Sequence, residues 1–243
     1  QFVPYSFNSK GLFFSFNRAM LNVFSYYKLH VLFHEIWIGD YPGASLKEKI
    51  IGCFQKKLIH DFLKASSPNI IHTTNFGYLK RLEKSGSIVE FLPMFGTVPV
   101  IESTKISEFE DLSDENDSVL KCCVFGSVYE DWPADLILDK LSSKLSLRKT
   151  VLRVYSIGSV GKGVGFWNRL KERFNDRVEF KDLGFLSEIQ VSSVLQGMDV
   201  GLSSTPLDIL GKSSSVATLL EHGLPVLIYD DEGTPNAELM VHS

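Results

Sequence analysis

The residues best suited to chemistry in this sequence are a lysine and the serines that follow it, Lys212, Ser213, Ser214 and Ser215. An apolar pattern with helical spacing comes next, so these residues should open a helix whose first backbone N–H groups have no intrahelical partner. One cation, several hydroxyl groups and free N–H groups together suit a phosphate or a diphosphate. The alternative interpretation is a helix capped at its amino end by one serine of a cluster.

Glycine-containing loops follow two of the predicted strands. After strand 119–125 come Gly126 and Ser127, where glycine lets the backbone approach a ligand closely; the alternative is a plain strand-to-helix turn. After strand 150–157 come Gly158, Gly161, Gly163 and Gly165, but their spacing is not that of a dinucleotide fingerprint. We therefore interpret this second loop as a mobile surface loop. The segment around Lys212 also lacks the first glycine of a P-loop, which disfavours a nucleotide triphosphatase.

Two histidines occupy similar places in the first half of the chain. His34 follows a buried apolar run and precedes Glu35 and Trp37, so it could orient a hydroxyl group or a phosphate, or could be a hydrogen-bonded structural histidine. His72 begins the run His72-Thr73-Thr74-Asn75 after the next strand. There we favour a helix cap formed by Thr or Asn.

Strand and helix patterns alternate along most of the chain, as in parallel sheets wrapped by helices. The predicted strands are 29–33, 69–72, 87–93, 119–125, 150–157, 177–180, 199–203 and 224–229. The predicted helices are 11–27, 45–64, 76–84, 134–145, 165–174, 187–195 and 213–222. The fold class is therefore α/β, and ligands are expected at the carboxyl ends of the strands.

An acidic stretch with almost no apolar periodicity interrupts this alternation. We interpret residues 97–118 as an interdomain linker between a first domain, 1–96, and a second domain, 119–243. The chain opens without methionine on an apolar run and closes without a helix stop signal, so we expect a fragment in which both domains are truncated.

Composition narrows the class of protein. The chain has 243 residues, a formal charge of -4 and 44% hydrophobic residues, which indicates a globular protein and argues against a dedicated nucleic-acid binder. Three cysteines, two of them adjacent in an apolar run, indicate a reducing compartment rather than a disulfide framework. With no apolar run long enough for a membrane span, we expect a cytoplasmic protein.

The order of these features resembles a known family. The run VEFKDLGFLSEIQVSSVLQGMDVGLSST followed by HGLPVLI is similar to the second domain of GT-B glycosyltransferases, in particular the large retaining group called family 4. His34 in LFHEIW resembles the histidine that this family places in its cleft. The resemblance covers most of residues 29–235 and implies two Rossmann-like domains that face each other across a cleft.

The resemblance also implies an activity and the parts of a site. The protein would be a glycosyltransferase that moves a sugar from a nucleotide-diphosphate donor to a glycan or a lipid-linked acceptor bound against the first domain near His34. No bound metal or other cofactor would be required. The implied donor contacts are, for the diphosphate, Gly126, Ser127, Lys212, Ser213, Ser214 and Ser215, and, for the nucleoside, Gly184, Phe185, Leu186, Thr218 and Glu221.

The chain departs from the family at several expected contacts. Leu210 and Thr218 stand where the family commonly has two glutamates, and Ser127 and Pro133 stand where it usually has arginine and lysine. One alternative function is therefore a catalytically silent GT-B-like module that binds a nucleotide, a glycan or a partner. A second alternative, a nicotinamide oxidoreductase, is suggested only by the glycines between 158 and 165.

The predicted helix 45–64 carries a basic face. Its apolar residues at helical spacing are Ile50, Ile51, Phe54, Leu58, Ile59 and Phe62, and its lysines are Lys47, Lys49, Lys56, Lys57 and Lys64. One interpretation is a peripheral contact with a negative membrane surface, which suits an enzyme with a lipid-linked acceptor. The other is a solvated helix whose apolar face packs on the sheet of the first domain. Both can hold together, because packing uses one face and the lysines the other.

Overall fold

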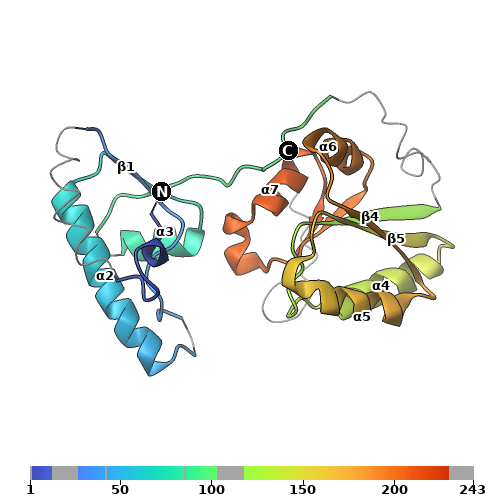
Figure 1. Ribbon diagram of the computed structural model, residues 1–243, viewed down its shortest axis with the longest axis horizontal. Helices are drawn as coiled ribbons and strands as arrows, with labels where there is room; N and C mark the ends of the chain where they lie inside the picture. Colours follow the sequence, from blue (N-terminus) through green and yellow to red (C-terminus); the bar gives the residue numbers. More distant parts are fainter. Residues whose placement is uncertain (1, 13–26, 42, 85, 103–117, 230–243) are drawn as a thin grey trace. The chain divides into compact units, whose positions relative to one another are not determined.

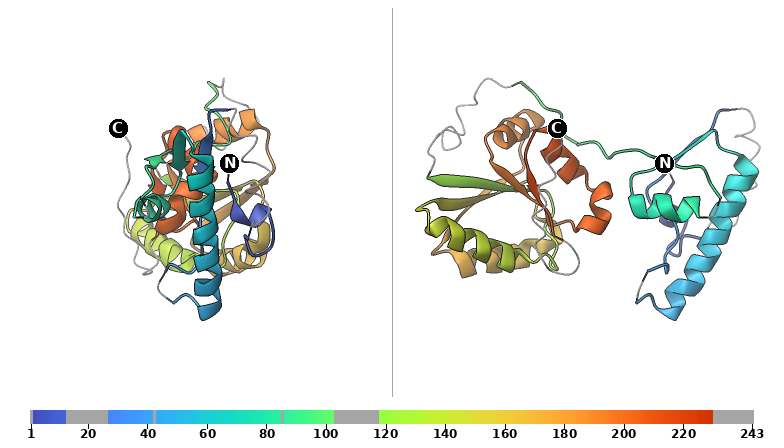
Figure 2. Two further views of the ribbon diagram at one scale, coloured as in Figure 1. Left: turned by 90° about the vertical axis from the view of Figure 1, so that its left-hand side faces the viewer. Right: turned by 180° about the vertical axis from the view of Figure 1, so that it is seen from behind.

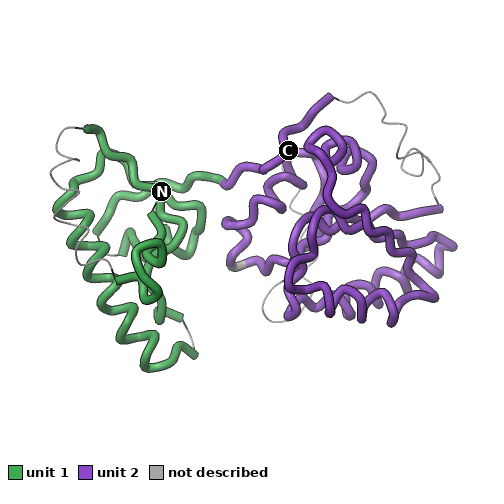
Figure 3. Tube along the Cα trace, viewed as in Figure 1, with its two compact units in different colours: residues 1–93 green, residues 94–243 purple. Residues whose placement is uncertain are grey.

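The computed structural model describes residues 2–12, 27–41, 43–84, 86–102 and 118–229. The chain forms two compact units, residues 1–93 (unit 1) and 94–243 (unit 2) (Figure 3). The division thus falls after Pro93, and residues 94–102, of which we assigned the last six to the linker, belong to unit 2. The predicted helix 11–27 lies largely outside the described residues, as do the acidic residues 103–117.

Unit 1 contains a parallel sheet in the order β1-β2-β3, made of β1 (His30–Phe33), β2 (Ile70–Thr73) and β3 (Glu90–Phe91). The connections are helices α2 (Leu46–Ser66) and α3 (Phe76–Glu83). Because each right-handed crossover moves one strand in the same direction, both helices belong on the same face of the sheet. The buried side chains of α2 and α3 form one core with Phe33 of β1 and with Phe2, which lies beside it.

The amino end of α2 is fixed by a reciprocal cap. The hydroxyl of Ser45 accepts from the backbone N–H of Glu48, and the carboxylate of Glu48 accepts from the backbone N–H of Ser45. The hydroxyl of Tyr41 donates to the same carboxylate at 2.6 Å. Together these hydrogen bonds, that of Tyr41 foremost, lower the pKa of Glu48 to about 2, so the cap stays charged at any ordinary pH.

Unit 2 is a doubly wound sheet in the order β6-β5-β4-β7-β8. Its strands are β4 (Val119–Phe125), β5 (Val151–Ile157), β6 (Val178–Gly184), β7 (Val200–Leu202) and β8 (Val226–Leu227), and all pairings are parallel. Its helices are α4 (Ala134–Ser146), α5 (Val164–Phe174), α6 (Glu188–Gln196) and α7 (Ser214–Glu221). Helices α4 and α5 cover one face, and α6 and α7 cover the other (Figures 1 and 2).

The central strand β4 shows how the sequence builds these two layers. Successive side chains of a strand point to opposite faces. Accordingly, Cys122 packs in the core beneath α4 and α5, whereas the adjacent Cys123 packs beneath α6 and α7. Burial raises the pKa of both thiols, that of Cys122 to about 12, so they serve as small apolar side chains.

The structure confirms the predicted fold class, an α/β protein with parallel sheets. Three predicted strands differ most in length. Strand 87–93 is reduced to Glu90–Phe91 and strand 224–229 to Val226–Leu227, while 177–180 extends to Gly184 because β6 pairs along nearly the whole length of β5. Among the described residues, no helix combines the length and the apolar character that a membrane crossing needs.

Candidate functional site

A cavity of about 430 Å³ lies at the carboxyl edge of the unit 2 sheet, within that unit. It occupies the place where a doubly wound sheet binds its ligands, beside the loop that follows the central strand β4. We call it the α7 pocket. Its described lining residues are Thr97, Phe125, Gly126, Ser127, Tyr129, Thr205, Ile209, Lys212, Ser213, Ser214 and Ser215.

The predicted anion-binding residues meet in this pocket at the amino end of α7. A 3₁₀ helix, Leu207–Lys212, delivers Lys212 to the start of α7, and Ser213 is the N-cap residue. The Ser213 hydroxyl accepts from the backbone N–H of Val216 at 3.3 Å and lies 3.1 Å from the hydroxyl of Ser215. Ser213 thus caps the helix, as the alternative interpretation predicts, while its neighbours line the cavity, and phosphate binding by them stays a prediction.

Gly126 and Ser127 form the facing wall. Gly126 has φ +85°, a conformation that side chains disfavour, and an added Cβ would lie 3.9 Å from Cβ of Ser215. The hydroxyl of Ser204 donates to the carbonyl of Ser127 at 2.9 Å and fixes the loop. The geometry brings the backbone at Gly126 close to Ser215, and the close approach of this backbone to a ligand stays a prediction.

The glycine loop after β5 lies largely at the surface, as predicted, but one of its glycines is packed. Gly163 is buried, and a Cβ at this position would lie only 2.1 Å from the carbonyl oxygen of Val128. The backbone N–H of Val128 also donates to the carbonyl of Val160 at 3.1 Å. Glycine at 163 is thus required for close packing of two loops, a reason that gives no support to a dinucleotide site.

The predicted nucleoside residues of the loop after β6 lie elsewhere. Strand β6 is separated from β4 by β5, and the described lining of the α7 pocket includes none of Gly184, Phe185 and Leu186. Phe185 is 86% exposed, whereas Leu186 packs partly on the core beneath α6 and α7. Contact of these residues with a nucleoside stays a prediction.

Thr218 and Glu221 hold a segment of backbone, and their contact with a nucleoside stays a prediction. The hydroxyl of Thr218 accepts from the N–H of Thr97 at 2.9 Å and donates to the carbonyl of Ser214 at 2.9 Å. Because Thr218 is fully buried and its hydroxyl has these two partners, it does not present a polar group to the pocket. The Glu221 carboxylate accepts from the N–H of Gly96 at 2.9 Å.

The backbone segment held by Thr218 and Glu221 is residues 94–102, which we call the strap. The sequence did not predict this contact, because residues 94–102 lack any regular pattern. The far end of the strap is held at α6, where Ser192 accepts from the N–H of Ile101 at 2.9 Å. Val98 is buried in the core between these anchors, and Thr97 reaches the α7 pocket. Gly96 lies close to α7, because a Cβ there would lie 2.5 Å from the carboxylate of Glu221.

Asp182 supports the β5–β6 side of the same sheet. Its carboxylate accepts from Ser156 at 2.7 Å, from the buried indole N–H of Trp167 at 2.8 Å and from Lys171 at 2.6 Å. Burial alone would raise the pKa of Asp182, but these hydrogen bonds, led by that of Lys171, lower it. All three partners belong to unit 2, so we assign Asp182 a structural role.

In unit 1, two polar side chains at the carboxyl edge are engaged, whereas the buried hydroxyl of Thr74 has no hydrogen-bond partner among the described residues. His34 directly follows β1, as predicted, and its backbone N–H donates to the carbonyl of Phe2 at 3.2 Å. Thr73 donates to the carbonyl of Phe33 at 3.0 Å. Asn75 caps α3 by accepting from the N–H of Tyr78 at 3.1 Å, which confirms the cap interpretation of that run. The catalytic role of His34 stays a prediction.

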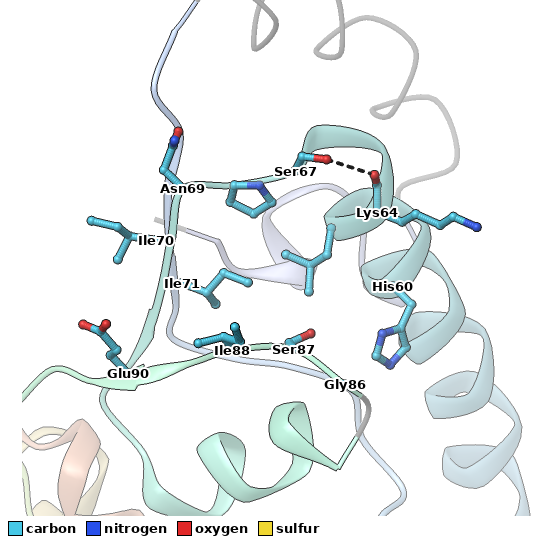
Figure 4. Close-up of a pocket in the computed structure, with 12 residues that line it drawn as sticks. His60, Lys64, Ser67, Asn69, Ile70, Ile71, Gly86, Ser87, Ile88 and Glu90 are labelled. Carbon is cyan, nitrogen blue, oxygen red and sulfur yellow. Dashed lines mark hydrogen bonds between the residues drawn. The ribbon is translucent and has the colours of Figure 1, made fainter.

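The cavity of unit 1 is larger, about 710 Å³, but it lies at the amino ends of β2 and β3 (Figure 4). Helix α2 lines it with His60 and Lys64, and Ile71 and Ile88 line it from the strands' side. Burial, followed by the charge of Lys56, lowers the pKa of His60. The described lining contains none of the residues that we predicted to bind a ligand.

A row of titratable side chains crosses the unit 1 sheet. His72 lies 2.7 Å from His30 through one ring nitrogen and 3.2 Å from Glu90 through the other. Because His72 uses opposite nitrogens for its two partners, the three groups do not converge on one point. In the described part of the chain, no group of three His, Cys, Asp or Glu residues could hold a metal ion.

Comparisons with known proteins yield distant structural likeness alone. No family model matches the chain, and no curated protein matches it. HepE from Anabaena, solved with UDP and glucose, is 14% identical with a TM-score of 0.46 over 85% of this chain and 54% of HepE. Sucrose-phosphate synthase from Thermosynechococcus elongatus is 13% identical with a TM-score of 0.49 over 83% of this chain and 50% of that one.

A third solved structure is WaaG, a glycosyltransferase involved in lipopolysaccharide biosynthesis. It is 14% identical with a TM-score of 0.40 over 86% of this chain and 75% of WaaG. The chain thus spans about half the length of HepE and of the synthase. At these identities and scores, none of the three assigns a family or an activity to the chain.

Proposed function

We propose that the chain is a glycosyltransferase of the GT-B type that uses a nucleotide-diphosphate sugar as donor and a glycan or a lipid-linked acceptor. The observation that carries the proposal is the meeting of Lys212, the amino end of α7 and Gly126 around one cavity at the carboxyl edge of a parallel sheet. The motif order after residue 177 supports the nucleotide sugar as the source of the anion.

The donor diphosphate would occupy the α7 pocket. Backbone N–H groups at the start of α7 and the positive end of its dipole favour negative charge there. As the bond between the sugar and the diphosphate breaks, negative charge grows on the departing diphosphate, and Lys212 would stabilise it. The pocket volume of about 430 Å³ is in the range of small-molecule sites.

The remaining roles complete the proposal. The nucleoside would extend from the α7 pocket toward Gly184, Phe185 and Leu186, where the exposed ring of Phe185 offers a stacking surface. The acceptor would bind unit 1 near His34. Retention of the anomeric configuration and independence from a bound metal belong to this proposal and follow from the family resemblance.

A catalytically silent module that binds a nucleotide is the second candidate. It is favoured by Leu210, whose side chain packs partly on the core, and by the fully buried Thr218, since these two positions carry glutamates in the family. Release of nucleoside diphosphate from a nucleotide sugar separates the candidates, because only the enzyme cleaves the donor.

The proposal is tested by thermal unfolding of the whole chain with uridine, guanosine and adenosine diphosphates, their nucleotide sugars, and NAD. A ligand that binds only the folded state raises the melting temperature, by an amount that grows with the ratio of concentration to Kd. We expect a nucleoside diphosphate to do so, and Lys212→Ala to abolish most of the shift. Lys162→Ala, at an exposed lysine of the same unit outside the described lining, is the matched control. Stabilisation by NAD alone would overturn the proposal.

A further inference from the structure

Helix α2 shows apolar side chains to solvent as well as to the core. Its buried residues are Gly52, Gln55, Leu58, Ile59, Phe62 and Leu63. Leu46, Ile50 and Phe54, spaced by four residues and therefore on one side of the helix, are 75%, 51% and 52% exposed. We call these three residues the apolar stripe. Packing on the sheet does not account for Ile50 and Phe54, which corrects that part of the sequence interpretation.

Exposed lysines surround the apolar stripe. By helical spacing, Lys47 and Lys49 lie on its two sides, and Lys57 continues its line one turn beyond Phe54. Of the acidic side chains of α2, Glu48 is turned into the cap with Ser45 and Tyr41, and Asp61 forms an exposed ion pair with Lys57 at 3.5 Å. An apolar line bordered by lysines is the pattern of a helix that lies in a membrane interface.

The formal charge of the chain is divided unequally between the two units, and unit 1 is the basic one. Unit 1 contains 11 Lys and Arg against 6 Asp and Glu, a formal charge of +5. Unit 2 contains 14 against 23, a formal charge of -9. The apolar stripe therefore belongs to the unit that an anionic surface would attract, and the acidic unit would be repelled by that surface.

The opposite side of α2 is fixed to its own unit. The side chain of Gln55 accepts from the N–H of Ile38 at 3.0 Å and donates to the carbonyl of Lys10 at 2.8 Å. Gly52 allows the chain to pass close by, because a Cβ there would lie 1.8 Å from the carbonyl oxygen of Ile38. The amino-terminal turns of α2 lie beyond the strands of the sheet (Figure 1).

We propose that the apolar stripe and its lysines dock unit 1 on an anionic lipid bilayer. Leu46, Ile50 and Phe54 enter the boundary between headgroups and acyl chains, and Lys47, Lys49 and Lys57 contact anionic headgroups. A lipid surface accounts for both features at once, since the apolar side chains need burial and the lysines need negative charge. This inference goes beyond the proposed function and does not depend on the α7 pocket.

The test is co-sedimentation of the whole chain with phosphatidylcholine vesicles, with and without phosphatidylglycerol. We expect binding to the anionic vesicles that weakens as salt is raised. Lys47→Gln with Lys49→Gln should reduce the partition coefficient by roughly fivefold for each lysine. Leu46→Gln, Ile50→Gln and Phe54→Gln, which keep helix propensity, should reduce it by about tenfold or more.

A matched control lies in unit 2, where Leu147 is 88% exposed and Lys140 and Lys144 are exposed nearby. Their combined replacement by glutamine should leave binding unchanged. Equal binding to neutral and anionic vesicles, or equal loss in both sets of variants, would overturn the proposal. A dimer in the absence of lipid that the stripe substitutions abolish would also overturn it, because a second copy would then cover the apolar stripe.

Insertion is read directly with Phe54→Trp, because the native Trp37, Trp132 and Trp167 are buried. Its emission should shift to the blue with anionic vesicles and be quenched by brominated acyl chains, whereas Leu147→Trp should respond to neither. An unshifted Phe54→Trp spectrum in vesicle-bound protein would contradict insertion. Nucleotide stabilisation measured on the same samples reports separately on the α7 pocket.

Discussion

The carboxyl edges of the two sheets differ in what their polar residues do. In unit 2, Lys212, the α7 serines and Gly126 come from segments far apart in the sequence and surround one cavity. In unit 1, Thr73 and Asn75 lie at the equivalent edge, but their side chains make internal hydrogen bonds. Thr73 donates to a backbone carbonyl group, and Asn75 caps a helix. The cavity of unit 1 lies at the other ends of its strands.

The difference teaches that a polar residue after a strand is not by itself a ligand contact. The rule that doubly wound sheets bind ligands at their carboxyl ends describes unit 2 well. There, glycine at position 126 leaves room and the amino end of α7 supplies unpaired N–H groups. In unit 1, the helix start that follows β2 also has a glycine, Gly77, but there a Cβ would lie 3.0 Å from the side chain of Asn75, which caps the helix.

The largest expected effect is that of His34→Ala, which would show that a residue at the carboxyl edge of the unit 1 sheet also acts on a ligand. If His34 acts on the acceptor or the transferred sugar, His34→Ala should lower turnover by about 100-fold or more, the contribution typical of a positioned acid or base. Nucleotide affinity should persist, since the α7 pocket belongs to unit 2. Steady-state kinetics and thermal unfolding of the same variant provide the measurement.

Two outcomes would assign His34 differently. A variant that unfolds would make His34 structural, like Asn75. A variant with full turnover and unchanged stability would remove His34 from the site.

A smaller effect concerns the strap. Gly96→Ala would place a Cβ 2.5 Å from Glu221 and 2.8 Å from Thr218, so the strap must move and lose its hydrogen bonds. We expect a loss of about 2 kcal/mol in the free energy of unfolding, together with weaker nucleotide binding because Thr97 lines the pocket. Denaturant unfolding and calorimetry measure the two effects.

The matched control for Gly96 is Gly86→Ala in unit 1, where φ is +88° and a Cβ would have open space. Backbone strain of about 1 to 2 kcal/mol should reduce stability there without changing nucleotide affinity. Equal nucleotide affinity in both variants would show that the strap does not shape the pocket.

The smallest expected effect compares a helix cap of unit 1 with a helix cap of unit 2. Asn75→Ala and Ser213→Ala each remove a side chain that accepts from a helix N–H, at a cost of about 1 kcal/mol in the free energy of unfolding. Only Ser213→Ala should also weaken nucleotide binding, because Ser213 lines the α7 pocket. Calorimetry on both variants tests this, and an equal loss of affinity would contradict it.

Local patterns were enough to predict most of the fold. The alternation of apolar strands with helices, and caps such as Ser187 and Ser213, are encoded within a few residues of each element. The meeting of Gly126 with the α7 serines followed from the rule that parallel strands end at one edge. The order of the strands in the sheet was not needed for that prediction.

Other features depend on contacts that no local pattern records. Glu221 and Thr218 bind the strap more than 100 residues earlier in the chain. Gly163 is glycine because Val128 packs against it, and Ile50 has the helical spacing of a core residue yet faces solvent. Spacing shows that residues share a side of a helix, but only the packed structure shows what covers that side.

The measurement that tests the central claim most directly is calorimetric titration of the whole chain with the nucleoside diphosphate that stabilises it most. The account predicts binding at one site and a loss of affinity of about 10- to 150-fold in Lys212→Ala, the equivalent of a charge-assisted contact of roughly 1.5 to 3 kcal/mol. Lys162→Ala should bind as the native chain does. Equal affinity in all three proteins, or no binding by the native chain, would contradict the placement of a donor diphosphate in the α7 pocket.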